Sequence, residues 1–410
     1  MEPTLVVVGL NHRTAPVEIR ERFWMNEERR SQALAILSSA EGVEEAFVFS
    51  TCHRTEFVLW GDPTLAANSV LRFLAAEYDL KLCEWNHFYR LLDEQALAHA
   101  FSVSCGLDAM YVKEGQIARQ VNAAWQQARK AGSSGRFLDT VLRKALAVRR
   151  RVRRETAIGS RMIAAPSAAL ELARKVVGPL AARDIVVLGA GQVSEVVAQS
   201  VVSHGVNSVC LINRTHRRAL ELAGRIGVSA CPFEERWTRL ASADLVISAT
   251  SAPGFILTAA EMRQVAAQRV GRKLVLIDLA LPRDIDPGVG KIEGMRLYDL
   301  DGLECALKPP STVQDGELAA QRIIFDEVQG FRKELMADRV VPEIAALHHR
   351  LEKICRQELE SFRIEQGPFP KDQDQLIAAV SVRITHKIAG SLARELKGQA
   401  KGHARTKAAV

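Results

Sequence analysis

The feature that most constrains the fold is a short apolar strand that runs straight into glycines. Residues 185–188 read Ile-Val-Val-Leu, Gly189-Ala190-Gly191 follow, and residues 192–204 have helical spacing. This order of strand, glycine turn and helix is typical of a dinucleotide-binding unit. Further strand-like segments follow, alternating with helical ones, at residues 208–215, 244–252 and 273–282. The alternation predicts a parallel, doubly wound sheet over residues 158–305.

The glycine turn predicts the phosphate-binding segment of a Rossmann-type domain. Gly189 allows the tight turn, and Gly191 lets a pyrophosphate approach the backbone at the helix N-terminus. Ser194 stands where a third glycine is usual, so we expect the helix to close on the strand less tightly. A glycine turn without a ligand is the alternative, which the strand–turn–helix context disfavours. The cofactor-binding positions predicted here are Gly189, Ala190, Gly191, Gln192, Val193 and Ser194.

The end of the next strand predicts which nicotinamide cofactor binds. An NAD site usually carries Asp or Glu about 20 residues after the glycines, where it binds the ribose hydroxyls. This strand instead ends at Asn213, Arg214 and Thr215, which we add to the cofactor-binding positions. Because a guanidinium matches a 2′-phosphate in charge and geometry, Arg214 favours NADPH over NADH. A surface arginine with no ligand is the alternative.

Residues 1–157 mix strands and helices without that regular alternation. Asn26 can cap a first helix over 26–40. The other segments are strand-like at 5–9, 46–50 and 56–60, and helical at 64–78, 93–102, 106–131 and 137–157. We therefore expect an N-terminal α+β domain.

Residues 306–410 carry no strand signal. Beyond Pro309-Pro310 the spacing is helical, in segments at 316–338, 342–365 and 371–396. Long, charged, amphipathic helices are typical of an oligomerisation arm. The predicted fold class is therefore an α/β multidomain protein, with an N-terminal α+β domain, a Rossmann-type NADP domain and a C-terminal all-helical domain.

Composition and charge indicate the cellular compartment and the kind of partner to expect. The seven cysteines are scattered, with no CxxC pair and no zinc spacing, which favours a reducing cytoplasm and predicts no metal site. The sequence has no uninterrupted apolar stretch of transmembrane length, so we expect no association with a membrane. The net charge is +7, and basic residues cluster between Arg143 and Arg154. This cluster favours a polyanionic partner such as RNA, and a solvated helix face is the alternative.

Cys52 lies between two strand-like segments, in the sequence Ser-Thr-Cys-His-Arg-Thr-Glu over residues 50–56. A nicotinamide domain implies hydride transfer, so the chain needs a hydride acceptor. A thiolate can attack an activated acyl group to form a thioester, which a hydride reduces to an aldehyde. Nearby cations lower the pKa of a cysteine, and Arg54, His53 and the more distant His99 could each do so. A small buried cysteine at a strand end is the alternative.

Several spaced motifs together resemble the glutamyl-tRNA reductase family. In chain order they are VVGLNHRTAPVEIRE, STC-x-RTE, GLDAM, RVRRET, GAG, NRT, DLVISATSAP and LPRDIDPGVG. The resemblance is collinear over about residues 5–305 and continues weakly beyond. It implies reduction of glutamyl-tRNA by NADPH to glutamate-1-semialdehyde, the first step of tetrapyrrole biosynthesis. It also implies a V-shaped homodimer held by the helical domain, and glutamate-1-semialdehyde aminotransferase as a partner.

The resemblance also implies roles for individual residues. Cys52 falls on the nucleophile and His99 on an activity-linked histidine. Arg54 is the expected partner of the glutamate side-chain carboxylate, because guanidinium binds carboxylate well. The substrate-contacting positions are Thr51, Arg54, Glu114, Gln116 and Gln120. A tRNA would supply the polyanion for the basic cluster.

Departures from the family pattern gather around the expected glutamate pocket. His53 replaces an asparagine, Ala109 a serine and Gly115 a proline, so these three are counted with the substrate-binding positions; Lys113 and Arg119 also depart. A protonated His53 would raise the thiolate content of Cys52, or its ring points away. The changes leave two alternatives open: a reductase of another aminoacyl-tRNA or acyl thioester, and a non-catalytic regulator that binds tRNA or NADPH.

Overall fold

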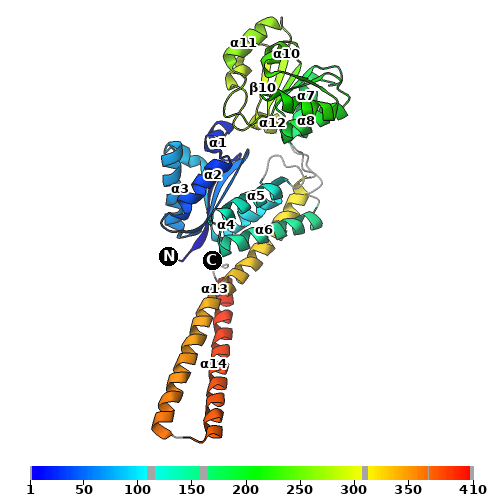
Figure 1. Ribbon diagram of the computed structural model, residues 1–410. Coiled ribbons are helices and arrows are strands. Elements are labelled where there is room, and N and C mark those ends of the chain that lie inside the picture. Colours follow the sequence, from blue (N-terminus) through cyan, green and yellow to red (C-terminus); the bar gives the residue numbers. More distant parts are fainter. Residues whose placement is uncertain (1, 109–115, 157–164, 307–312, 368, 407–410) are drawn as a thin grey trace. The chain divides into compact units, whose positions relative to one another are not determined.

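The computed structural model describes residues 2–108, 116–156, 165–306, 313–367 and 369–406. By its internal contacts the chain divides into two compact units, residues 1–322 and 323–410. The first unit contains two separate sheets with their helices, and the second is helical (Figure 1). The predicted fold class is confirmed. The domain boundaries at residues 157 and 305 stay predictions.

The N-terminal sheet is antiparallel, in the order β2-β3-β1-β4. Its strands are β1 (Thr4–Asn11), β2 (Val43–Thr51), β3 (Arg54–Gly61) and β4 (Tyr89–Leu92). The first three confirm the predicted strands and extend them, whereas the short β4 escaped prediction. Thr51 pairs with Arg54, so only Cys52 and His53 form the turn between β2 and β3. The sheet therefore places the cysteine at the tip of a tight hairpin.

Helices pack around this sheet. Their bounds are α1 (Val17–Phe23), α2 (Glu27–Ser38), α3 (Pro63–Tyr78), η1 (Glu84–His87), α4 (Asp93–Cys105), α5 (Gln116–Lys130) and α6 (Arg136–Glu155). Asn26 caps α2, because its side chain accepts from the Arg29 amide. The predicted helix start at residue 106 is wrong, because Gly106 takes the left-handed conformation that ends α4. Residues 109–115 of that predicted helix lie outside the described residues.

The second sheet is parallel throughout, in the order β10-β9-β8-β5-β6-β7. Its strands are β5 (Ile185–Leu188), β6 (Val209–Ile212), β7 (Ser229–Cys231), β8 (Leu245–Ser248), β9 (Leu274–Asp278) and β10 (Met295–Tyr298). Ile185 and Val187 enter one apolar cluster, and Val186 and Leu188 enter another. Because successive strand residues point to opposite faces, the sheet is buried on both sides, as in a doubly wound fold.

The connections of this sheet are helical. Their bounds are α7 (Ala165–Val177), α8 (Gln192–Ser203), α9 (His216–Ile226), η3 (Phe233–Glu235), α10 (Arg236–Ser242), α11 (Ala259–Gln268), η4 (Pro287–Lys291) and α12 (Leu300–Ala306). Strand β5 continues through the glycines into α8, which confirms the predicted strand–turn–helix unit.

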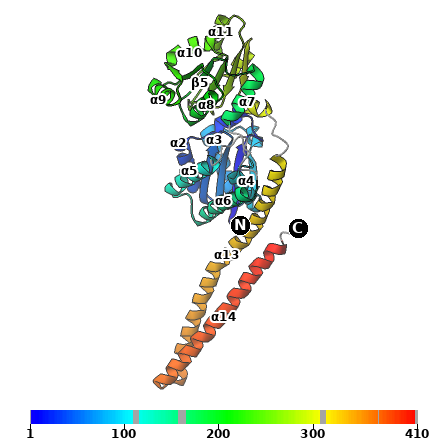
Figure 2. The ribbon, with the colours of Figure 1, turned by 90° about the vertical axis from the view of Figure 1, so that its right-hand side faces the viewer.

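Two long helices, α13 (Val313–Gln366) and α14 (Lys371–Thr406), follow. They run antiparallel after a short connection, as Figure 2 shows. The connection is closed by the stacked rings of Phe362 and Phe369 and by an ion pair of Arg363 with Asp374 at 2.7 Å.

The predicted break between residues 338 and 342 is wrong. A proline removes one backbone donor, and here Pro342 lies within a helix that continues past it.

One stretch, Lys371–Glu395 of α14, is long and apolar enough to cross a membrane by length and composition, with a mean hydropathy of 1.2. The prediction that the chain has no such stretch therefore needs correction. Only 11% of the stretch is buried. Most of its exposed apolar residues recur every four residues and so share one helix face, namely Leu376, Val380, Ile384, Ile388 and Leu392, whereas Val382 falls outside this spacing. That pattern is typical of a helix that packs against other protein.

Candidate active site

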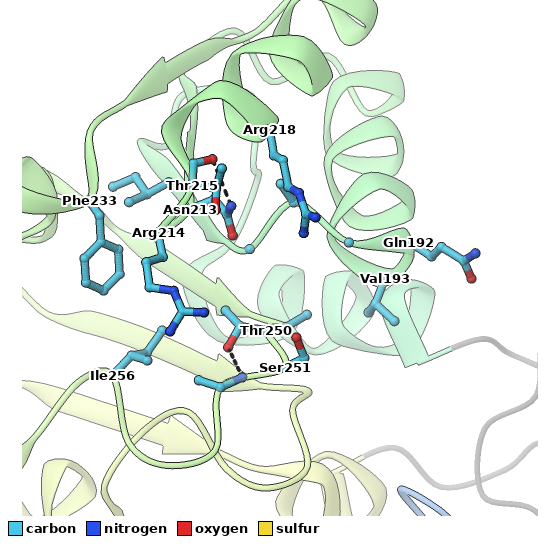
Figure 3. A pocket seen from close by; sticks show the side chains of 16 residues that line it. Gln192, Val193, Asn213, Arg214, Thr215, Arg218, Phe233, Thr250, Ser251 and Ile256 are labelled. Carbon is cyan, nitrogen blue, oxygen red and sulfur yellow. Dashed lines mark hydrogen bonds between the residues drawn. The ribbon is translucent and has the colours of Figure 1, made fainter. Parts of the chain in front are cut away.

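A cavity of about 440 Å³ opens at the carboxyl ends of β5, β6 and β8, where ligands of parallel sheets bind (Figure 3). All the predicted cofactor positions except Ser194 line it. Its lining consists of Gly189, Ala190, Gly191, Gln192, Val193, Ile212, Asn213, Arg214, Thr215, Arg218, Phe233, Ala249, Thr250, Ser251, Ala252 and Ile256.

The two glycines of the turn have different reasons to be glycine. Gly189 has a φ of +113°, and a Cβ there would lie 2.6 Å from both the Ala249 carbonyl oxygen and the Ser194 hydroxyl. A Cβ on Gly191 would meet no protein atom within 4 Å. Gly189 is therefore required by the fold, whereas Gly191 leaves room for a ligand to approach the backbone, as a pyrophosphate does.

Ser194 supports the pocket instead of lining it. Its side chain is fully buried, and its hydroxyl donates to the Ala249 carbonyl oxygen at 3.0 Å. The expectation that Ser194 would bind cofactor is therefore corrected, because the hydroxyl is directed into the protein. The hydrogen bond ties α8 to the end of β8.

Two arginines extend into the pocket, Arg214 after β6 and Arg218 from α9 (Figure 3). Only the first was predicted. Arg218 lies in the first turn of α9, whereas Arg214 precedes this helix. The pair supplies two positive charges beside the site that binds the ribose in this fold.

Asp284 holds the opposite wall of the pocket. Its carboxylate accepts from the Ser248 hydroxyl at 2.6 Å and from the amide and hydroxyl of Thr250 at 2.8 and 2.5 Å. The segment after β8 is thereby fixed where it lines the cavity. Sequence analysis identified this strand but assigned no cofactor role to Thr250 or to its neighbours.

Cys52 is partly exposed in its hairpin turn, and it packs against the apolar cluster of the parallel sheet. Burial raises the pKa of its thiol, while the positive charges of Arg20 and then Arg54 act to lower it. Arg54 therefore acts in the expected direction, but desolvation outweighs the cations in the free protein. The leading cation is also Arg20, which sequence analysis did not single out.

His53 is buried beside His12, with the two rings 6.0 Å apart. Burial, followed by the neighbouring His12, Arg20 and Arg54, lowers the pKa of His53 to about 3. The imidazole is therefore neutral near pH 7. His53 therefore carries no positive charge that could activate the Cys52 thiol near pH 7. The first of the two expectations for this residue is not met.

Arg54 is 4% exposed and lies among protein acceptors. Its Nη1 donates to Glu56 at 2.7 Å and to the Asp108 carboxylate at 2.9 Å, and its Nη2 donates to the Asp108 carbonyl oxygen. These bonds use three of the five N–H donors of the guanidinium, and the predicted role of Arg54 as a clamp for the substrate carboxylate stays a prediction.

Glu56 joins Arg54 to His99. One carboxylate oxygen, Oε1, accepts from Arg54, from the Tyr89 hydroxyl at 2.5 Å and from His99 Nε2 at 2.8 Å. Burial raises the pKa of Glu56, but Arg54 and His99 outweigh it and hold the value at about 2. The ionised carboxylate thereby fixes the orientation of the His99 ring.

The other predicted substrate positions are less fully connected. The Thr51 hydroxyl accepts from the His53 amide at 3.3 Å, within the hairpin. Gln116 and Gln120 both lie on α5. Ala109, Glu114 and Gly115 lie outside the described residues.

The N-terminal site also contacts the parallel-sheet part of the first unit. Arg283 donates to Glu21 and Glu18 on α1 at 2.8 Å each. Arg20, also on α1, donates to Asp301 of α12 at 2.6 Å. These ion pairs join α1 to α12 and to Arg283, which follows β9, and sequence analysis assigned a role to none of these residues.

Comparisons with known proteins agree across the chain. Residues 8–156 match the family "Glutamyl-tRNAGlu reductase, N-terminal domain". Residues 171–306 match "Shikimate / quinate 5-dehydrogenase", and residues 319–410 match "Glutamyl-tRNAGlu reductase, dimerisation domain".

Individual relatives extend over most of the chain. A glutamyl-tRNA reductase of Desulforudis audaxviator is 39% identical over 358 residues, which cover 87% of this chain and 80% of that protein. The "Glutamyl-tRNA reductase 2" of Koribacter versatilis is 34% identical over 398 residues, 96% of this chain and 91% of that protein. The solved glutamyl-tRNA reductase of Methanopyrus kandleri is 28% identical, with 97% of this chain and 98% of that chain covered and a TM-score of 0.45.

A parallel sheet with a dinucleotide-type pocket, joined to a domain with a cysteine at a hairpin tip, defines a nicotinamide-dependent oxidoreductase. Relatives more than 30% identical over most of the chain make the assignment specific. The chain belongs to the glutamyl-tRNA reductase family.

Proposed function

We propose that the protein reduces glutamyl-tRNA with NADPH to glutamate-1-semialdehyde and releases the tRNA. The observation that carries this proposal is the partly exposed Cys52 at the hairpin tip, packed against the core of the domain that holds the cofactor pocket. A thiol needs an activated acyl group, and an aminoacyl ester is one. Relatives that share most of the chain bear the name of this activity.

Individual residues of this chain have separate roles in the proposed reaction. The Cys52 sulfur attacks the ester carbonyl carbon, an S–C bond forms, the C–O bond to the ribose breaks, and the tRNA leaves with a proton on its ribose oxygen. Bound in the cofactor pocket, NADPH supplies the hydride that, together with a proton, converts this thioester to the aldehyde and regenerates the thiol. Glu56 holds His99 in one orientation, which suits His99 for polarising the reacting group.

NADPH fits the pocket better than NADH. The free space at Gly191 accommodates a pyrophosphate at the N-terminus of α8. Arg214 and Arg218 both line the cavity, and an arginine pair suits a 2′-phosphate. The lining carries no carboxylate from a described residue, so nothing there takes the ribose-binding role of the acidic residue in NAD sites.

The tRNA and a second copy of the chain are the partners that we propose. Helix α6 buries one apolar face, and its remaining faces carry the arginines of the basic cluster, which suits phosphate binding. An apolar groove lies between α13 and α14 and is lined by Leu351, Ile354, Leu359, Phe362, Ile377, Ile384 and Ile388. A second copy of the chain would cover this groove, so α14 would lie in the dimer interface. We also expect the protein to be cytoplasmic. The aminotransferase partner stays a prediction.

The test is NADPH oxidation with glutamyl-tRNA, compared between the wild type and Cys52→Ser. Cys83→Ser is the matched control, because Cys83 is an exposed free cysteine of the same N-terminal region. We expect oxidation in the wild type and in Cys83→Ser, and loss of it in Cys52→Ser. Equal rates in all three proteins would remove Cys52 from the reaction.

A further inference from the structure

Two buried cysteines are in contact on adjacent strands of the parallel sheet. Cys210 on β6 and Cys231 on β7 are 6% and 4% exposed, and both are free thiols. The Cys210 sulfur donates to the Cys231 sulfur over 3.1 Å, and both side chains belong to the same apolar cluster. A disulfide bond is about 2.05 Å long, so the two sulfurs need to approach by only about 1 Å more. The pair is therefore placed for oxidation to a disulfide.

The strand register shows what closing that bond requires. Cys210 pairs with Ser229 and Ile212 pairs with Cys231, so the two cysteines are diagonal neighbours on one face of the sheet. Diagonal neighbours in sheets have Cα atoms about 7–8 Å apart, whereas a disulfide that leaves the backbone in place needs a Cα separation below about 7 Å. Formation of the disulfide therefore draws β6 and β7 together.

Strand β7 is the more movable of the two. It has three residues and lies at the edge of the sheet, whereas β6 is held between β5 and β7. The chain continues from Cys231 through Pro232 to Phe233, which lines the cofactor cavity. A displacement of Cys231 is therefore transmitted over two residues to the wall of the cavity.

This part of the wall is a stack of side chains. The Arg236 guanidinium lies 4.0 Å from the centre of the Phe233 ring and 4.1 Å from that of Trp237, and its Nη1 donates to the Phe233 carbonyl oxygen at 3.0 Å. In the cavity the Phe233 ring lies on the same side as Arg214 and Ile256 (Figure 3). Because the stack is joined by these contacts, a shift of Phe233 changes the shape of the cavity beside Arg214.

The two thiols differ in their hydrogen bonding. Cys210 donates and the Cys231 sulfur accepts. Burial, followed by this hydrogen bond, raises the pKa of the Cys210 thiol to about 12. Cys210 therefore keeps its proton near pH 7, and Cys231 is the sulfur that reacts first with an oxidant.

We propose that Cys210 and Cys231 are a site of reversible oxidation by peroxide, and that their disulfide weakens cofactor binding by displacing β7 and Phe233. The Cys231 sulfur attacks one oxygen of hydrogen peroxide, becomes a sulfenic acid, and one water leaves. The Cys210 sulfur then attacks the Cys231 sulfur, the S–S bond forms, and the hydroxyl leaves with the Cys210 proton as a second water. Two electrons pass from the two thiols to the peroxide. Because a strained disulfide is reduced easily, a thiol reductant restores the pair.

The test treats the full-length protein with hydrogen peroxide in the absence of tRNA. Remaining thiols are blocked with iodoacetamide, and a digest made without reductant is searched by mass spectrometry for the Cys210 and Cys231 peptides joined by a disulfide. The affinity for NADPH is measured by fluorescence titration before and after the treatment. We expect the joined peptides, and a Kd for NADPH that rises about fivefold or more, which corresponds to the loss of about one contact. Dithiothreitol should return the Kd to its starting value.

Three variants accompany this experiment. Cys210→Ala and Cys231→Ala each remove the disulfide, so peroxide should leave their Kd for NADPH unchanged, and either one decides the matter if the other fails to fold. Cys105→Ala is the matched control, because Cys105 is another buried free cysteine and lies on α4. We expect it to respond to peroxide as the wild type does. Cys52 is present in all four proteins, so its own oxidation affects them equally.

Three results would overturn the proposal: no joined peptides from the wild type, an unchanged Kd in the protein that carries the disulfide, or an equal rise of the Kd in Cys210→Ala and Cys231→Ala. The choice of NADPH as the probe rests on the proposed function. A protein that shows the disulfide-dependent rise of the Kd but no NADPH oxidation with glutamyl-tRNA would refute the proposed function and leave the oxidation site standing. The two failures are therefore distinguishable.

Discussion

Glu56→Gln tests whether the buried network holds an ionised carboxylate. Glu56 is 3% exposed, and its pKa moves from an ordinary 4.5 to about 2, with burial opposed by Arg54 and His99. That shift corresponds to roughly 3 kcal/mol of stability. Removing one partner of a buried ion pair costs a similar amount, about 3–5 kcal/mol, and Arg54 would keep only Asp108 as a carboxylate partner.

The pH dependence follows from the sign of the shift. The folded-state pKa is depressed, so the stabilisation is complete above about pH 4.5 and is lost as pH falls toward the folded value of about 2. We therefore expect Glu56→Gln to lower the free energy of unfolding by roughly 3 kcal/mol near pH 7, and by about 1 kcal/mol less than that near pH 3.5.

The assay is denaturant unfolding followed by tryptophan fluorescence. Trp60 lies on the same strand as Glu56 and stacks on Phe137 at a centroid distance of 3.5 Å, so it reports on this sheet. Glu44→Gln is the control, because Glu44 is exposed on β2, and a change within about 0.5 kcal/mol is expected there. A loss below about 1 kcal/mol in Glu56→Gln, with no dependence on pH, would refute the reasoning.

Four further outcomes are expected. Gly189→Ala, which brings a methyl group 2.6 Å from a backbone carbonyl oxygen, should lower the melting temperature, whereas Gly191→Ala should keep it and weaken NADPH binding in a fluorescence titration. Arg214→Ala should raise the KM for NADPH by about 10- to 100-fold and leave that for NADH unchanged, because it removes a charge-assisted hydrogen bond. Ile384→Asp, at an exposed apolar position of α14, should give monomers in sedimentation analysis; a dimer would contradict the role of this groove. His53→Asn should leave the rate profile from about pH 6 to about pH 9 unchanged, because a group with a pKa of about 3 does not titrate there.

The parallel domain could be predicted from the sequence because its signals are local. The apolar run, the glycines and the following helix lie within one continuous segment, and Gly189 is required by that segment itself. The short edge strands β7 and β10 escaped prediction because they are partly exposed and mix polar with apolar residues, whereas β5, β6 and β8, of four residues each, are buried apolar runs. Ser194 was misassigned because its partner, the Ala249 carbonyl oxygen, is 55 residues away in the sequence.

The thiol site could be predicted only in part. Arg54 and Glu56 alternate along β3, so a shared strand face for this charged pair was readable from the sequence. Asp108 is 54 residues from Arg54, and Tyr89 is 33 residues from Glu56, and no local pattern joins such positions. The charge balance at Cys52 depends on burial and on Arg20, which a reading of neighbouring residues does not reveal.

The most direct test of the account is mass spectrometry of the protein mixed with glutamyl-tRNA in the absence of NADPH. We predict that the peptide containing Cys52 gains one glutamyl group through a thioester, that added NADPH removes it with formation of the aldehyde, and that Cys52→Ser gains nothing. Aldehyde formation by Cys52→Ser, or a glutamyl group on a residue other than Cys52, would contradict the account.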